Sequence, residues 1–168
     1  MEGTKLAGED GESTNDKRKG AAGRGEPGEP NRSDVGGQGG LVRRIDNANT
    51  GTSKTASVFA DLPVNTSVSS IYKDKLDPDH ALISLFSYGS SLENVYVTYN
   101  DGAEWTAIEG DLPDMPVNWA IFDPSDHDKV MIATEAGVWV TDDVNGNNTH
   151  WEPINPDNGM PFVDVDML

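Results

Sequence analysis

Short sequence elements recur along the chain at intervals of 43 to 50 residues, and this repeat constrains the fold more than any other feature. The recurring pairs are Leu62-Pro63 with Leu112-Pro113, Asp77-Pro78 with Asp123-Pro124, Val95-Tyr96-Val97-Thr98 with Val138-Trp139-Val140-Thr141, and Trp105 with Trp151. Each interval holds short strand-like runs separated by Asp, Pro, Gly and Asn turns, without a helical period. A repeat of this length that contains four strands is typical of β-propeller blades. The sequence therefore predicts an all-β, antiparallel fold.

A polar turn closed by a tryptophan occurs in each repeat. Residues 98–105 read Thr-Tyr-Asn-Asp-Gly-Ala-Glu-Trp and lie between two strand-like runs. Asn-Asp-Gly supplies the positive φ angles and the side-chain hydrogen bonds that a tight hairpin needs. The second copy, residues 141–151, keeps Thr141, Asp143, Gly146 and Trp151 but is three residues longer. We therefore expect a hairpin at the same place in both units.

These turns resemble the Asp-box, the Ser/Thr-x-Asp-x-Gly-x-x-Trp hairpin of BNR-repeat propellers. The families concerned are sialidase-like, sortilin-like and xyloglucanase-like propellers of large secreted bacterial proteins, and the resemblance covers residues 55–168. Asn100 stands where the family has Asp. The resemblance implies a secreted or cell-surface location and a structural role for the hairpin residues. Those residues are Thr98, Asn100, Asp101, Gly102, Trp105, Thr141, Asp143, Gly146 and Trp151.

The chain divides into two segments by composition. Residues 1–45 hold 11 of the 18 glycines, eight basic and eight acidic residues and almost no large apolar side chain, so we expect this segment to be disordered. Residues 46–168 are predicted to form a partial propeller with full blades at about 64–111 and 114–158. One further strand is expected on each side, at Thr55–Phe59 and Phe162–Leu168.

Two blades cannot close into a ring, because closed propellers have roughly four to eight blades. The fold class that we predict is therefore an incomplete β-propeller of four-stranded antiparallel blades with Asp-box hairpins, preceded by a disordered segment. We expect the chain to be a fragment of a longer protein, in preference to a unit that forms a ring by self-assembly. Exposed blade edges predict oligomers or aggregation in isolation.

Charge and composition exclude several classes of partner. The net charge is −17, and residues 46–168 contain 21 acidic residues, four lysines and no arginine. A surface this acidic repels phosphate backbones and anionic lipids, so we expect neither nucleic acid nor a membrane surface as a partner. No stretch approaches the length of a membrane span, so we expect no membrane insertion. The chain has no cysteine, which excludes disulfides and thiolate chemistry. We expect no cofactor.

Candidate pocket residues lie on the expected inner strands and on the links that lead into them. They are Asp114, Asn118, Trp119, Asp164 and Asp166. A sialidase needs an arginine cluster and a Tyr nucleophile assisted by Glu, whereas other glycosidases need two carboxylates that flank the scissile bond. No arginine follows Arg44, and carboxylate pairs arise by chance in so acidic a segment. We therefore nominate no catalytic residue.

Metal sites are not expected either. The spacing of Thr141, Asp143, Asn145 and Glu152 imitates an EF-hand loop, but its first ligand is a threonine and no helix flanks it. His80, His127 and His150 lie at or beside turns, far apart in sequence, and are interpreted as exposed loop histidines.

Three functions remain open at this stage. The first is a non-catalytic module that binds a polysaccharide or a protein ligand. The alternative is part of a glycoside hydrolase, sialidase-like or glucanase-like, whose active site needs further blades. A propeller that acts as an assembly factor is the third.

Overall fold

A computed structural model describes residues 22–26, 29–50, 55–89, 92–154 and 163–168. Within these ranges the chain is all-β, apart from one 3₁₀ turn at η1 (Gly146–Asn148). No helix in the described part of the chain is long and apolar enough to cross a membrane.

The strands form three antiparallel sheets of four strands each. The first sheet contains β1 (Ala22–Glu26), β2 (Glu29–Gly36), β3 (Leu41–Asp46) and β4 (Thr55–Asp61). The second contains β5 (Val68–Lys73), β6 (Ala81–Leu85), β7 (Val95–Thr98) and β8 (Thr106–Ala107). The third contains β9 (Val117–Asp123), β10 (Asp126–Thr134), β11 (Gly137–Thr141) and β12 (Glu152–Pro153). Strand order follows chain order in every sheet, so the predicted four-stranded antiparallel units are confirmed.

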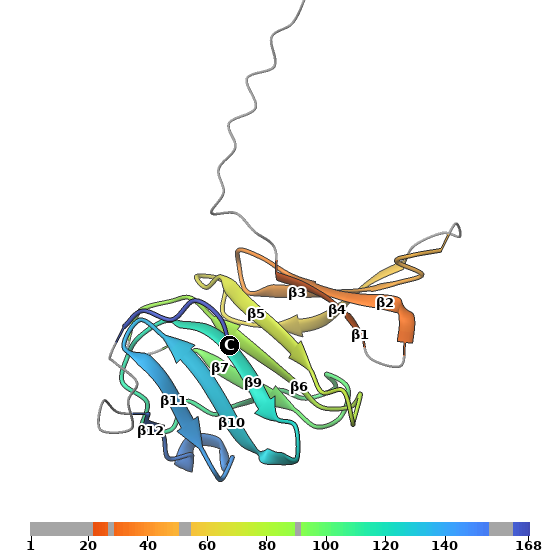
Figure 1. Ribbon diagram of the computed structural model, residues 1–168. Helices are drawn as coiled ribbons and strands as arrows, with labels where there is room; N and C mark the ends of the chain where they lie inside the picture. The colour runs from red at the N-terminus through yellow and green to blue at the C-terminus, as the bar shows by residue number, and fades with distance from the viewer. Residues whose placement is uncertain (1–21, 27–28, 51–54, 90–91, 155–162) are drawn as a thin grey trace, which may run out of the picture.

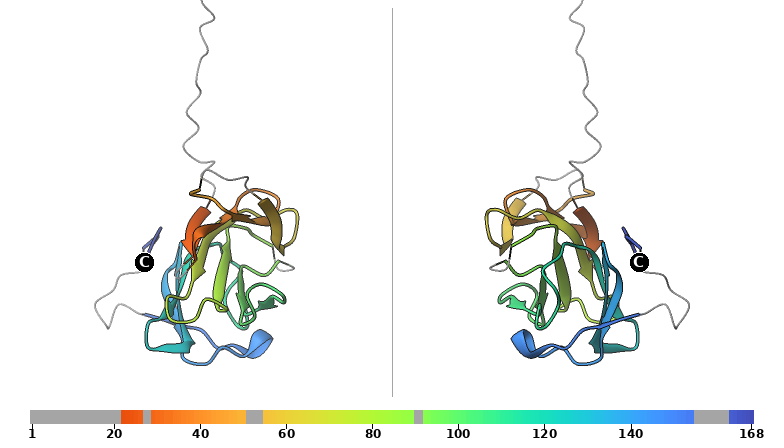
Figure 2. Two further views of the ribbon diagram at one scale, coloured as in Figure 1. Left: turned by 90° about the vertical axis from the view of Figure 1, so that its right-hand side faces the viewer. Right: turned by 90° about the vertical axis from the view of Figure 1, so that its left-hand side faces the viewer.

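The sheets pack one after another in chain order, and the first strands of neighbouring sheets lie against each other. Strand β5 contacts β1 on one side and β9 on the other (Figures 1 and 2). This is the arrangement of neighbouring blades, and the sheets are called blades 1, 2 and 3 below.

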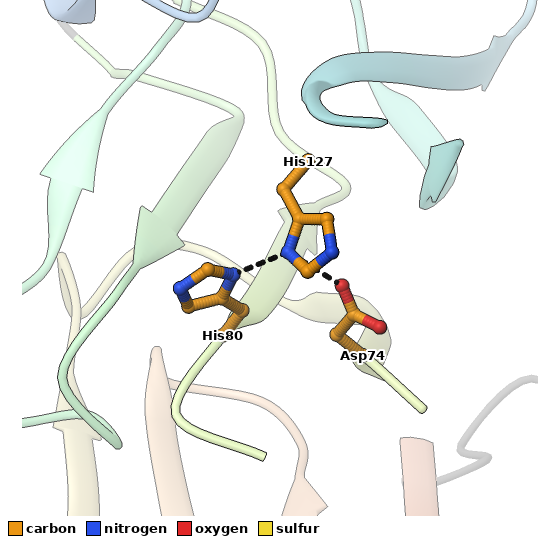
Figure 3. A group of neighbouring side chains, drawn as sticks. All are labelled: Asp74, His80 and His127. Atoms are coloured by element: carbon orange, nitrogen blue, oxygen red, sulfur yellow. Dashed lines mark hydrogen bonds and ion pairs between the residues drawn. The ribbon is translucent and has the colours of Figure 1, made fainter. Parts of the chain in front are cut away.

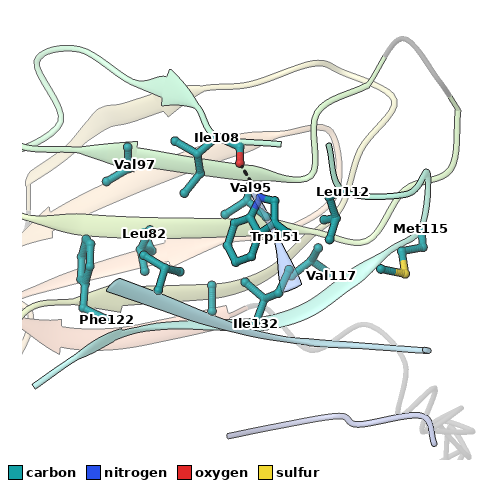
Figure 4. Close-up of a cluster of buried hydrophobic side chains, with 12 residues drawn as sticks. Leu82, Val95, Val97, Ile108, Leu112, Met115, Val117, Phe122, Ile132 and Trp151 are labelled. Carbon is teal, nitrogen blue, oxygen red and sulfur yellow. Dashed lines mark hydrogen bonds between the residues drawn. The ribbon is translucent and has the colours of Figure 1, made fainter. Parts of the chain in front are cut away.

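Two apolar clusters hold the blades together. Strand β6 lies in the middle of blade 2 and is buried along its whole length. Because side chains alternate across a strand, Leu82 faces blade 3 whereas Ala81, Ile83 and Leu85 face blade 1. The cluster between blades 2 and 3 also includes Trp151, whose Nε1 donates to the carbonyl of Ile108 at 2.9 Å (Figure 4). The tryptophan of the second hairpin thus anchors blade 3 to blade 2.

The predicted end of the disordered segment at residue 45 is wrong, because β1, β2 and β3 lie before it. The composition of β2 and β3 misleads because two ion pairs form between these strands. Arg44 Nε donates to the buried Asp34 at 3.1 Å, and Arg32 Nε donates to Asp46 at 3.1 Å. Residues 1–21, to which the same prediction applies, lie outside the described residues.

The two predicted flanking strands have different outcomes. Thr55–Phe59 lies within β4 and completes a four-stranded sheet, so it is the last strand of a whole blade. At the other end, Phe162 lies outside the described residues and residues 163–168 form no strand. Val165 instead donates its backbone N–H to Thr134 at the end of β10, at 3.0 Å. This single backbone hydrogen bond to the end of β10 is not a strand pairing, so residues 163–168 do not form the predicted flanking strand.

Candidate functional site

One end of blades 2 and 3 gathers loops from distant parts of the sequence. The loop after β6 bonds to the link before β9, since Gly89 N–H donates to Asp114 Oδ1 at 2.9 Å. The C-terminal segment bonds to β9, since Asn118 Nδ2 donates to Asp164 Oδ1 at 3.1 Å. Figure 1 shows the C-terminus beside the end of β10 at this place. We name this surface, formed by Phe86–Gly89, Asp114, Asn118, Glu135 and Asp164, the loop-end face.

An exposed aromatic pair is the main feature of the loop-end face. Phe86 is 52% exposed and Tyr88 is 58% exposed, and their rings meet edge to face at a centroid distance of 6.3 Å. The Tyr88 hydroxyl donates to Glu135 Oε2 of blade 3 at 2.6 Å. This hydrogen bond is the main cause that raises the pKa of Tyr88. Desolvation and the charges of Glu135 and Asp164 add smaller contributions. Phe86 and Tyr88 therefore expose two aromatic rings to solvent, and the bond to Glu135 fixes the position of the Tyr88 ring. Exposed aromatic rings of this kind are suited to contact a ligand.

The predicted pocket residues are only partly brought together. Asn118 bonds to Asp164 and also donates to the Val165 carbonyl at 2.9 Å. Asp114 lies on the same face and is exposed, as is Asp166. Trp119 points elsewhere. Ala120 and Phe122, one and three residues after it on β9, face blade 2, and the alternation of side chains therefore directs Trp119 to the other side of blade 3. Its buried Nε1 has no hydrogen-bond partner among the described residues.

A hollow of about 230 Å³ adjoins Asp114. Its lining residues are Leu92, Glu93, Glu109, Gly110, Leu112 and Asp114. Burial raises the pKa of the Glu109 carboxyl to about 7, and the nearby Glu93 and Asp114 carboxylates add to the rise. The N–H of Asn94, which donates to Glu109 Oε2, acts in the opposite direction. Glu109 is therefore a carboxyl group that can both give and accept a proton near neutral pH.

The first hairpin is tied by its threonine and asparagine side chains. Thr98 Oγ1 accepts from Gly102 N–H at 3.0 Å, and Asn100 Oδ1 accepts from Glu104 N–H at 2.9 Å. Asp101 and Gly102 have positive φ angles of 54° and 83°, as the Asn-Asp-Gly turn requires. Asn100 thus accepts a turn N–H with its side-chain oxygen.

Asp101 points from this hairpin into an ionic network between blades 1 and 2. Its carboxylate accepts from Lys73 Nζ at 2.8 Å and from Arg44 Nη1 and Nη2 at 2.8 and 2.9 Å. Arg44 also bonds to the buried Asp34 of blade 1. Burial acts to raise the pKa of Asp101, but the bonds from Lys73 and Arg44 outweigh it and hold that pKa below its ordinary value.

The second hairpin is held from outside by the link between blades 2 and 3. Asp111 Oδ1 accepts from Trp151 N–H at 2.8 Å, and Oδ2 meets His150 Nδ1. The bond from Trp151 is the main cause that lowers the pKa of Asp111. Within the hairpin, Thr141 Oγ1 accepts from Asp143 N–H at 3.3 Å, and Gly146 has a φ of 55°.

Several residues of the candidate site could not be identified from the sequence. Phe86, Tyr88, Glu109 and Glu135 lie in loops or at strand ends, where no repeat marks them. The histidines carry a signal: His127 follows His80 by 47 residues, which is within the range of the repeat. They occupy comparable places after the two Asp-Pro turns, and neighbouring blades bring such places together. The structure joins them with Asp74, which corrects their interpretation as separate loop histidines.

Comparison of the sequence with protein-family models and with curated proteins finds no match. The fold is similar to that of two GH74 enzymes. An ancestral GH74 enzyme matches 82% of this chain at 21% identity with a TM-score of 0.59, and 19% of that enzyme is covered. The GH74 xyloglucanase from Xanthomonas campestris matches 79% at 14% identity with a TM-score of 0.57, and 22% of it is covered.

These likenesses concern the fold. The chain spans about a fifth of the length of the enzymes that it matches. The predicted fold class, an open set of four-stranded propeller blades, is confirmed.

Proposed function

We propose that these blades belong to a propeller that binds polysaccharide at the loop-end face. The observation that carries the proposal is the exposed pair of Phe86 and Tyr88, with the Tyr88 hydroxyl bonded to Glu135 of the next blade. The Asp-box interpretation of the two hairpins supports it, because such hairpins are found in glycan-active propellers. The two hairpins lie at the end of the blades away from the loop-end face, and their polar side chains stabilise the turns.

The chemistry of the loop-end face fits a neutral sugar chain. Aromatic rings provide flat apolar surfaces for the C–H faces of sugars, and carboxylates and amides accept or donate hydrogen bonds to hydroxyls. Asp114, Glu135 and Asp164 supply acceptors around the rings, and Asn118 supplies an amide. The net charge of −17 disfavours an anionic ligand. We expect the affinity to change little with salt, because a neutral ligand has no charge to screen.

Binding to a panel of xyloglucan, cellulose and starch tests this function, with xyloglucan chosen because one matched enzyme is a xyloglucanase. Phe86→Ala and Tyr88→Ala should each weaken binding about tenfold, since an aromatic contact contributes roughly 1–1.5 kcal/mol. Leu76→Ala is the matched control, because Leu76 is also exposed but follows β5 at the other end of the blades. Equal affinities for all variants would contradict the proposal.

A glycoside hydrolase is the second candidate, and Glu109 is the observation that favours it. A carboxyl with a pKa of about 7 beside further carboxylates, here Glu93 and Asp114, is the pattern of a general acid and its partner. Both fold neighbours are GH74 enzymes. Release of reducing ends from the same panel distinguishes the candidates. A hydrolase produces them and loses this activity in Glu109→Gln, whereas a binding module produces none and keeps its affinity.

A further inference from the structure

Three potential metal ligands from two blades meet at the end opposite the loop-end face. Asp74 directly follows β5, His80 directly precedes β6, and His127 lies at the start of β10 (Figure 3). His80 Nδ1 lies 2.6 Å from His127 Nδ1, and Asp74 Oδ2 lies 3.0 Å from the same His127 nitrogen. One nitrogen or oxygen atom from each residue lies within 4.8 Å of the others.

The carboxylate is held in place by its own loop. Asp74 is buried, and its Oδ1 accepts from the N–H of Leu76 at 2.8 Å. Its backbone N–H donates to the carbonyl of His80 at 3.0 Å, which closes the loop between β5 and β6. The second oxygen, Oδ2, is therefore directed at His127 before any ligand binds.

The imidazole rings are also oriented. Asp77 Oδ2 lies 3.5 Å from Nε2 of His80, so a proton on Nε2 faces the carboxylate and the lone pair of Nδ1 faces His127. Pairing of a histidine with a carboxylate through the nitrogen that does not bind the metal is the usual outer shell of metal sites. Tyr99 packs edge to face on His80 at 4.8 Å, and Phe122 lies beside both histidines.

We propose that Asp74, His80 and His127 bind a divalent transition metal ion of the zinc type, which joins blade 2 to blade 3. Two imidazole nitrogens and one carboxylate oxygen are the donors that Zn²⁺ takes, with water in the fourth position. Metal–ligand bonds of about 2.0–2.2 Å place tetrahedral ligand atoms about 3.3–3.6 Å apart. The ligand atoms lie no more than 4.8 Å apart and the two Nδ1 atoms lie 2.6 Å apart, so displacements of about 1–1.5 Å, produced by side-chain rotation, bring them to that geometry.

This site lies apart from the proposed polysaccharide surface and does not depend on it. Two lone pairs cannot face each other at 2.6 Å without a proton or a cation between them. The simplest arrangement without metal is a hydrogen bond from one protonated Nδ1, and the experiment separates that arrangement from a metal site.

Calorimetric titration of the chelator-treated full chain with ZnCl₂ is the test. We expect one zinc ion per chain, and we expect His80→Asn and His127→Asn each to abolish this binding. Asp77→Asn should weaken it about 10–100-fold, because outer-shell partners have effects of that size. His150→Asn is the matched control, since His150 also meets carboxylates, Asp111 and Glu152, but lies elsewhere on the surface.

A spectroscopic measurement on the unchanged chain covers the case in which a histidine variant does not fold. Co²⁺ should give the visible ligand-field bands of four-coordinate cobalt, and one equivalent of Zn²⁺ should remove them. The proposal is overturned if neither Zn²⁺ nor Co²⁺ binds stoichiometrically. It is equally overturned if folded His127→Asn binds zinc as well as His150→Asn does.

Discussion

The ionic network between blades 1 and 2 predicts a large effect of Asp101→Asn on stability. Lys73 is completely buried, and its ammonium donates to the Asp101 carboxylate. Removal of one partner of a buried ion pair costs about 3–5 kcal/mol, because it leaves the other charge in a medium of low dielectric. Asp101 is 32% exposed, and Arg44 keeps its bond to Asp34. We therefore expect a smaller loss, about 2 kcal/mol.

Urea denaturation measures this loss. With a slope of about 1–3 kcal/mol per molar urea, a loss of about 2 kcal/mol lowers the midpoint by about 1 M. Asp142→Asn is the control, because Asp142 is 85% exposed and pairs with Lys129 at 3.4 Å on the surface. Exposed pairs of this kind contribute about 0–1 kcal/mol.

A double-mutant cycle with Lys73→Met isolates the interaction itself. We expect Lys73→Met with Asp101→Asn to lose less than the sum of the single variants, by at least about 1 kcal/mol. The reasoning is refuted if Asp101→Asn is no more destabilising than Asp142→Asn, or if the two changes are additive. Because the folded-state pKa of Asp101 is lowered, its contribution is present above the unfolded-state pKa and is lost as pH falls through the folded-state value.

Two further predictions concern the link between blades 2 and 3. A Cβ on Gly110, at φ 55°, would lie 1.9 Å from the backbone oxygen of Thr149, so Gly110→Ala should cost about 3 kcal/mol or more in urea denaturation. Gly146→Ala has the same φ but its nearest neighbour is 3.7 Å away, and a cost of about 1 kcal/mol is expected; equal losses would contradict this account. The folded-state pKa of Glu109 is raised to about 7, so its ionisation opposes folding increasingly from about pH 4.5 to pH 7. The unchanged chain should therefore have a lower urea midpoint at pH 8 than at pH 5, and Glu109→Gln should reduce this difference. If the variant and the unchanged chain lose the same stability between pH 5 and pH 8, the prediction is contradicted.

The blades could be predicted because the repeat carries their pattern. Turn residues and short apolar runs recur in order, and each unit needs the same hairpins. The first three strands of blade 1 were missed because they are rich in Gly and charged residues, whereas its last strand, β4, was predicted. Pairs such as Asp34–Arg44 form only when β2 and β3 are already side by side, and composition alone does not reveal such pairing.

The candidate site was predictable only where the residues lie on the inner strand or on the link before it. Asn118 and Asp114 follow from that topology, and both reach the loop-end face. Tyr88 and Glu135 belong to different blades, and their hydrogen bond depends on how two loops approach. Burial sets the pKa of Glu109, and no residue near it in sequence indicates that burial.

The most direct test of the central claim is a heteronuclear NMR titration of the full chain with a xyloglucan oligosaccharide. The account predicts that amide shifts change in Phe86–Gly89 and at Asp114, Asn118 and Glu135, and that the His80 and His127 loops stay unchanged. Shift changes confined to the end of the blades that carries those histidines, or no saturable change with any oligosaccharide of the panel, would contradict it.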